Sequence, residues 1–168
     1  MAFQPNQIVL VDTNVILEAH RTGCWVPISQ YFDLHTVDKV IEETQTGFQN
    51  RSNEQTIDEA KLRASFSNIA VINNEQRAAF NLAHNHPALD DGERDLLVYA
   101  ETLPNTVWFL NSPDMAAVRF VFGRGWIDRM VSLEVLASHL KARLGEDLRG
   151  NYTERWLSGK RTSLILGT

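Results

Sequence analysis

Apolar residues in this chain fall into short runs that alternate with amphipathic stretches. The run Ile8–Val11 is wholly apolar and rich in β-branched residues, which is typical of a buried parallel strand. The same pattern predicts further strands at residues 34–37, 69–72, 106–110 and 130–133. Helical spacing predicts helices at residues 15–20, 25–32, 37–47, 57–66, 74–85, 92–103, 113–122 and 134–144, with a polar loop at 50–53. This alternation predicts a three-layer α/β/α sandwich with a central, mainly parallel sheet.

The length of 168 residues favours one domain, which we expect to span residues 1–148. Residues 149–168 mix Trp156 and an apolar end with basic side chains, and we treat them as a C-terminal arm of unknown role. Cys24 is the only cysteine, which excludes an internal disulfide and a thiolate metal cage. The chain shows neither a signal-peptide pattern nor an apolar run long enough to cross a bilayer, so we expect a cytoplasmic protein without a membrane partner.

The net charge of −5 is unevenly distributed along the chain. Residues 1–114 hold 7 basic and 16 acidic side chains, whereas residues 115–168 hold 9 basic and 5 acidic ones. A basic C-terminal third beside an acidic region could position a polyanion. A solvated helical surface of mixed charge explains the same distribution equally well.

Acidic residues recur at the ends of apolar runs, where a predicted strand ends, a helix begins or the apolar stripe of a helix stops. These residues are Asp12, Glu42, Glu43, Asp90, Asp91, Glu93, Asp95 and Asp114. Each one alone can be explained as a helix cap or a solvated surface charge. However, open α/β sheets keep their sites outside the carboxyl ends of the strands, so several of these carboxylates should converge there. Converging carboxylates need a counter-charge, which indicates an Mg²⁺ or Mn²⁺ site and phosphoryl chemistry.

Several other kinds of site are not supported by the sequence. A phosphatase of the haloacid-dehalogenase type carries a second aspartate two residues after its nucleophile, and Asn14 occupies that position here. His84 and His86 stand two residues apart without an evident third metal ligand. Gly123-Arg124-Gly125 lacks the rest of a dinucleotide-binding motif.

Taken in order, the acidic motifs resemble those of the PIN-domain family, a group of metal-dependent nucleases that includes toxin ribonucleases of toxin–antitoxin pairs. The resemblance runs from Ile8 to about Leu140. Its motifs are Val11–Leu17, Val40–Glu43, Gly92–Ala100 (similar to a Gly-Glu-x-Glu-x-Ile-x-x-Ala helix of one branch), Leu110–Asp114 and Gly125–Glu134. Thr44 replaces the leucine that usually follows the second acid, so the choice between Glu42 and Glu43 stays open.

The resemblance implies hydrolysis of RNA by metal-activated water, with Asp12, Glu43, Asp95 and Asp114 as catalytic metal ligands. It further implies accessory roles for Glu93 and Asp91, positioning of water or phosphate by Thr13, Asn14 and Ser112, and RNA contacts by Arg119 and Arg124. An antitoxin-like protein partner and a homodimer are also implied. The alternative is a catalytically inactive PIN fold that binds RNA or a partner protein.

Overall fold

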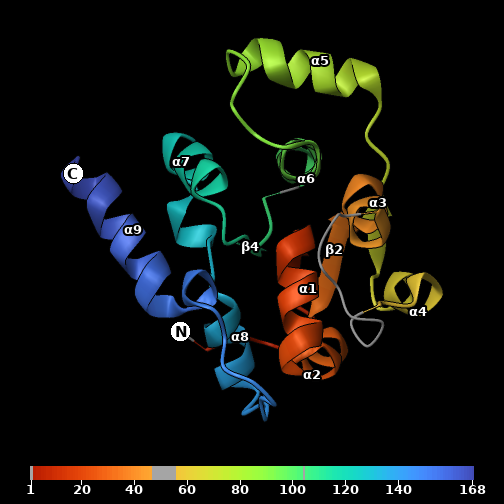
Figure 1. The fold of residues 1–168 in the computed structure, drawn as a ribbon. Coiled ribbons are helices and arrows are strands. Elements are labelled where there is room, and N and C mark those ends of the chain that lie inside the picture. Colours follow the sequence, from red (N-terminus) through yellow and green to blue (C-terminus); the bar gives the residue numbers. More distant parts are fainter. Residues whose placement is uncertain (1, 47–55, 104) are drawn as a thin grey trace.

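Four parallel strands form the centre of the computed structural model, which describes residues 2–46, 56–103 and 105–168 (Figure 1). Within these residues the strand order is β3-β2-β1-β4. The strands are β1 (Ile8–Val11), β2 (Asp33–Val37), β3 (Asn68–Ala70) and β4 (Trp108–Asn111). The chain adds β2 and β3 on one side of β1 and then returns to place β4 on the other. The strand order therefore reverses at β1, and such a reversal opens a crevice at the carboxyl end of the strand.

Helices cover the sheet and complete the expected three-layer α/β/α sandwich. They are α1 (Thr13–Thr22), α2 (Trp25–Tyr31), α3 (Asp38–Thr46), α4 (Glu59–Ala64), α5 (Asn74–Ala83), α6 (Asp91–Thr102), α7 (Met115–Gly123), α8 (Leu133–His139) and α9 (Glu154–Leu166). Both α3 and α6 pack against β2 and against each other, and α1 packs against α3. Their N-termini consequently lie near the carboxyl ends of β1 and β2.

Acidic residues begin three of the helices that surround this crevice. Asp12 caps α1 by accepting a hydrogen bond from the Val15 N–H, and Asp114 caps α7 in the same way. Asp90 caps α6 and forms a capping box with Glu93, in which each side chain accepts a hydrogen bond from the backbone N–H of the other residue. Capping thus fixes the acids of the sequence motifs at the helix ends that face the crevice.

The predicted fifth strand at residues 130–133 is wrong. Met130 makes only an isolated bridge with Leu110, and residues 127–129 form a 3-10 turn. Ser132 accepts a hydrogen bond from the Val135 N–H and so starts α8 at Leu133. The following helix is also shorter than predicted, because it ends at His139 and Lys141 has a positive φ of 50°. The predicted loop at residues 50–53 lies outside the described residues.

The C-terminal arm is a docked helix, preceded by a 3-10 turn at Gly150–Tyr152. In Figure 1, α9 runs alongside α7 and α8, and it packs against both. The start of the arm is tied to α1 by the buried carboxylate of Glu18, which accepts a hydrogen bond from the Arg149 N–H at 2.9 Å and pairs with Arg21 at 2.7 Å. Among the described residues, none of the helices has the length and apolar character needed to cross a membrane.

Candidate functional site

Asp12 lies at the carboxyl end of β1 with only 3% of its surface exposed. Its Oδ1 accepts a hydrogen bond from the Val15 N–H at 2.9 Å, and its Oδ2 accepts one from the Ser112 hydroxyl at 2.9 Å. Burial raises the pKa of Asp12 to about 7, although both hydrogen bonds act in the opposite direction. A helix cap that is exposed to solvent would keep an ordinary acidic pKa. The burial and raised pKa of Asp12 are therefore not explained by its capping role alone.

Glu43 projects from α3 toward the N-termini of α1 and α6. Its Oε2 accepts a hydrogen bond from the Thr13 hydroxyl at 2.7 Å, and its Oε1 accepts one from the Gly92 N–H at 3.1 Å. Burial raises its pKa, and the charge of Asp90 adds to this effect. The neighbouring Glu42 is exposed and pairs with Lys39 at 3.3 Å. The choice that the sequence left open therefore falls on Glu43 as the residue that faces the site.

Glu93 is buried in the first turn of α6, with 6% of its surface exposed. Its Oε2 accepts a hydrogen bond from the Asp90 N–H at 3.3 Å. Its Oε1 is buried and has no hydrogen-bond partner among the described residues. Burial, followed by the charges of Asp90, Asp114 and Asp12, raises the pKa of Glu93 to about 8. Glu93 is therefore a buried acid with one oxygen free to bind a ligand.

Ser112 and Asp114 contribute the β4 side of the site. The Ser112 hydroxyl donates to Asp12 and accepts from the Asp114 N–H at 3.3 Å. The carboxylate of Asp114 caps α7 and raises the pKa of both Asp12 and Glu93 through its negative charge. Ser112 thus orients Asp12, and Asp114 belongs to the same group of interacting acids.

Asp90 also belongs to this group of acids, because its charge acts on Asp12, Glu43 and Glu93. The sequence placed Asp90 among the acids expected to converge and gave it no separate role. One further polar residue was missed in the sequence. Asn111 at the end of β4 is buried, and its side-chain Nδ2 has no hydrogen-bond partner within the described ranges. Its place immediately before Ser112 was the only signal in the sequence.

Asp95 does not join this group. It lies on α6 with 1% of its surface exposed, and its carboxylate forms a two-pronged ion pair with Arg77 of α5, with Nη2 to Oδ2 at 2.7 Å and Nε to Oδ1 at 2.9 Å. Arg94 adds a third contact at 3.3 Å. Asp91 is exposed and pairs with Arg94 at 3.0 Å. The structure therefore places Glu93, rather than Asp95, beside Asp12 and Asp114.

The predicted RNA-contacting arginines differ in where they lie. Arg119 is exposed on α7. Arg124 follows the far end of α7, about 15 Å along the axis from the Asp114 cap. There it pairs with Glu101 at 3.3 Å and lies 4.6 Å from the centre of the Trp126 ring. Arg124 is consequently engaged in local contacts away from the acids.

The acidic group fits a hard divalent cation in its donor chemistry. All of its candidate ligands are carboxylate or hydroxyl oxygens, which Mg²⁺ and Mn²⁺ prefer, and Glu93 Oε1 is an unpaired buried oxygen. In the part of the chain that the structure describes, no group of three or more His, Cys, Asp or Glu side chains is already spaced to hold a metal ion. The oxygens of Asp12 and Glu43 instead accept hydrogen bonds from neighbouring backbone and hydroxyl groups. Binding of an ion would have to replace some of these bonds.

Comparison with protein-family models, with curated proteins and with solved structures gives no match to this chain.

Proposed function

We propose that this chain is a cytoplasmic, metal-dependent ribonuclease of the PIN type that hydrolyses phosphodiester bonds in RNA. The observation that carries the proposal is the pair of buried acids Asp12 and Glu93, whose pKa values are raised to about 7 and about 8 by burial and by neighbouring carboxylates. Such acids are largely or partly protonated at neutral pH, and a bound cation would favour their ionised forms. Acidic metal sites at the carboxyl ends of strands commonly serve phosphoryl chemistry.

The proposed ligands of the ion are Asp12, Glu43, Glu93 and Asp114. When bound, Mg²⁺ or Mn²⁺ would supply an activated water and neutralise charge on the phosphate. Thr13 and Ser112 orient ligands, because their hydroxyls donate to Glu43 and Asp12 respectively. Asn14, half-buried in the first turn of α1, is the residue proposed to contact water or phosphate. Asp95 is left out because Arg77 already neutralises it.

The test of this function is Asp12→Asn, which removes the charge and keeps the shape. We expect the variant to lose RNA cleavage in Mn²⁺ by at least about 100-fold, a change typical for the loss of a catalytic group. The matched control is Asp128→Asn, an exposed acid on the 3-10 turn after α7. Cleavage that survives EDTA, or a variant as active as the wild type, would refute a metal nuclease. RNA binding without any cleavage by the wild type would instead favour the inactive PIN-fold module.

Resemblance to toxin ribonucleases adds two further proposals, an antitoxin-like protein partner and a homodimer. Light scattering on the purified chain tests the homodimer directly, since a monomer at micromolar concentration contradicts it. Co-purification with the product of a neighbouring gene, followed by loss of cleavage in the complex, would support the antitoxin-like partner.

A further inference from the structure

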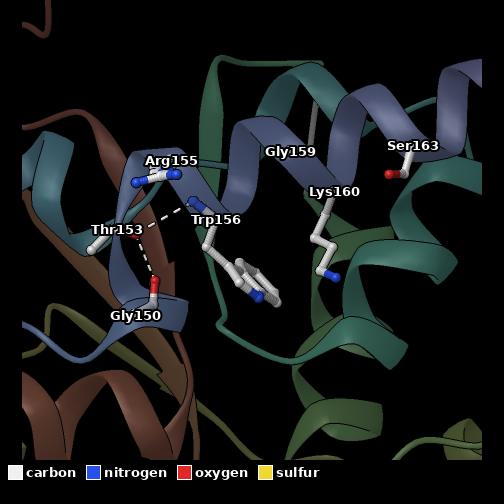
Figure 2. Close-up of a pocket in the computed structure, with 7 residues that line it drawn as sticks. All are labelled: Gly150, Thr153, Arg155, Trp156, Gly159, Lys160 and Ser163. Atoms are coloured by element: carbon white, nitrogen blue, oxygen red, sulfur yellow. Dashed lines mark hydrogen bonds between the residues drawn. The ribbon is translucent and has the colours of Figure 1, made fainter.

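The C-terminal arm carries an open groove of about 470 Å³ that has no part in the proposed chemistry (Figure 2). Its lining residues are Gly150, Thr153, Arg155, Trp156, Gly159, Lys160 and Ser163. In Figure 2, Trp156 and Lys160 project from the same side of α9, and Ser163 lies further along the helix. From Thr153 to Ser163 the helix rises about 15 Å, which is the length of about four stacked nucleotides. The groove is therefore long enough for a short extended ligand.

The basic residues of the arm divide into two groups with different roles. Arg149 pairs with the buried Glu18, and Arg161 contacts Glu154 and the backbone oxygen of Met130, so both hold the arm to the domain. Arg155 and Lys160 form no ion pair with any described residue, and both line the groove. Lys160 lies 6.0 Å from the centre of the Trp156 ring. Two cations that do not stabilise the fold are thus available to an anionic ligand.

The other lining residues favour a flat ligand over a protein helix. Among the described residues that line the groove, Trp156 is the only one with an apolar side chain, whereas an amphipathic helix needs several apolar contacts spaced along its length. None of these lining residues carries a carboxylate. An indole ring beside basic side chains that form no ion pair is the combination that binds single-stranded nucleic acid. The ring stacks on a base, and the basic side chains contact phosphates.

Gly159 keeps the middle of the groove open. A Cβ added there would meet nothing within 4 Å, so packing does not require a glycine at this position. Glycine inside a helix is unfavourable relative to residues with a side chain. A glycine without a packing role is explained if a ligand approaches the helix closely at this point.

The groove begins on either side of a buried tyrosine. Its first lining residues, Gly150 and Thr153, flank Tyr152, which is buried. Burial raises the pKa of Tyr152, and the negative charges of Asp12 and Glu18 raise it further. Tyr152 therefore lies within electrostatic reach of Asp12.

We propose that the groove on α9 is an RNA-binding site outside the acidic centre, in which Trp156 stacks on a base and Arg155 and Lys160 contact phosphates. The choice of RNA as the ligand rests on the proposed ribonuclease function. The binding itself needs neither metal nor cleavage.

The experiment measures binding of a fluorescent 12-nucleotide oligouridylate to the full chain in EDTA over a series of salt concentrations. Arg155→Gln with Lys160→Gln should reduce the slope of log K against log salt by about 1.4, because two phosphate contacts to a single strand are lost. The charge-matched control is Lys61→Gln with Arg143→Gln, two exposed cations outside the groove, which should leave the slope unchanged. Equal slopes for the two double variants would overturn the proposal.

Two further variants separate binding from folding. Trp156→Ala should weaken oligouridylate binding about tenfold, the effect of one stacked base. Gly159→Leu should fill the groove and weaken binding by a similar factor while raising Tm by about 3 °C through helix propensity. If Gly159→Leu binds as tightly as the wild type, the groove is not the site. An oligoglutamate of equal charge that binds as well, with the same sensitivity to Lys160→Gln, would reassign the groove to an acidic protein segment.

These variants test the RNA-binding site on α9 and the proposed catalytic function separately. Asp12→Asn should bind oligouridylate as the wild type does and cleave nothing, whereas Trp156→Ala should raise the KM for RNA cleavage in Mn²⁺ about tenfold. If the wild type binds oligouridylate through the groove but never cleaves RNA in Mn²⁺, the proposed catalytic function fails and the RNA-binding site stands.

Discussion

Gly92 lies directly against Glu43. The Gly92 N–H donates a hydrogen bond to Glu43 Oε1 at 3.1 Å, and a Cβ on Gly92 would collide with the Glu43 carboxylate. Since α6 supplies Gly92 and α3 supplies Glu43, this contact joins two helices through residues that are 49 positions apart in the chain. The glycine that begins the Gly-Glu-x-Asp stretch of the sequence is thus needed for space beside a buried acid.

We expect Gly92→Ala to displace the Glu43 carboxylate and to reduce Mn²⁺ affinity and RNA cleavage by about tenfold or more. The flexible Glu43 side chain can move away, so stability should change by less than about 1 kcal/mol, because alanine favours the helix. Calorimetric titration with Mn²⁺ and urea unfolding measure the two effects. Gly123→Ala is the control, since an added Cβ there meets nothing within 4 Å. Wild-type metal affinity in Gly92→Ala would contradict the role of this contact.

Glu43→Gln and Glu42→Gln form a matched pair on adjacent positions of α3. Glu43 accepts hydrogen bonds from Thr13 and Gly92, whereas Glu42 is exposed beside Lys39. Glu43→Gln should lower kcat/KM for RNA by about 100-fold. Glu42→Gln should stay within about twofold, because exposed ion pairs contribute little. Single-turnover cleavage assays distinguish them, and equal losses would contradict the assignment of the site-facing position to Glu43 rather than Glu42.

The roles of Glu93 and Asp95 can be separated by comparing metal affinity with stability. Glu93→Gln should weaken Mn²⁺ binding at least tenfold, since Glu93 Oε1 is an unpaired oxygen beside the other acids. Asp95→Asn should leave Mn²⁺ affinity nearly unchanged but destabilise the fold by about 2 kcal/mol, because it weakens a buried ion pair with Arg77. Titration with Mn²⁺ and urea unfolding of both variants provide the measurements. The opposite pattern would restore Asp95 as the metal ligand.

The metal-free protein should lose stability as the pH rises from about 5 to about 8. The folded-state pKa values of Asp12 (about 7) and Glu93 (about 8) exceed the ordinary values of 3.8 and 4.5. Between the ordinary and the raised pKa values, the folded chain still binds protons that the unfolded chain has released. A higher pH therefore favours unfolding in this range. Below about pH 4 both states are protonated and the effect vanishes. The loss should be on the order of 4 kcal/mol per group.

Urea unfolding in EDTA at pH 5, 6.5 and 8 measures this dependence. The Asp12→Asn, Glu93→Gln double variant should show a flatter profile and should be more stable than the wild type at pH 8. Addition of Mn²⁺ should stabilise the wild type more at pH 8 than at pH 6, because the ligands must be deprotonated to bind it. A wild-type stability that rises between pH 5 and pH 8 in EDTA would contradict the raised pKa values.

Local pattern was enough to predict most of the fold. The apolar run Ile8–Val11 and the amphipathic stretches after it specify β1 and the helices, because burial of one face requires that periodicity whatever the partner. The four-residue run at 130–133 is apolar except for Ser132 and forms no strand. Two contacts favour a different structure there. Ser132 caps α8, and Arg161 of the distant α9 donates a hydrogen bond to the Met130 oxygen. Such contacts join residues that a local pattern cannot connect.

The sequence by itself determined that the acids stand at strand ends and helix starts, because capping and the helix dipole favour them there. Only the tertiary structure decided which of them meet. Asp95 and Glu93 stand two residues apart on α6, yet packing of α5 brings Arg77 to the first. The N-caps of α1 and α7, Asp12 and Asp114, instead place negative charge near the second. Whether a buried carboxylate is neutralised or left to bind a ligand depends on which charges pack against it, and those charges come from elements far apart in the chain.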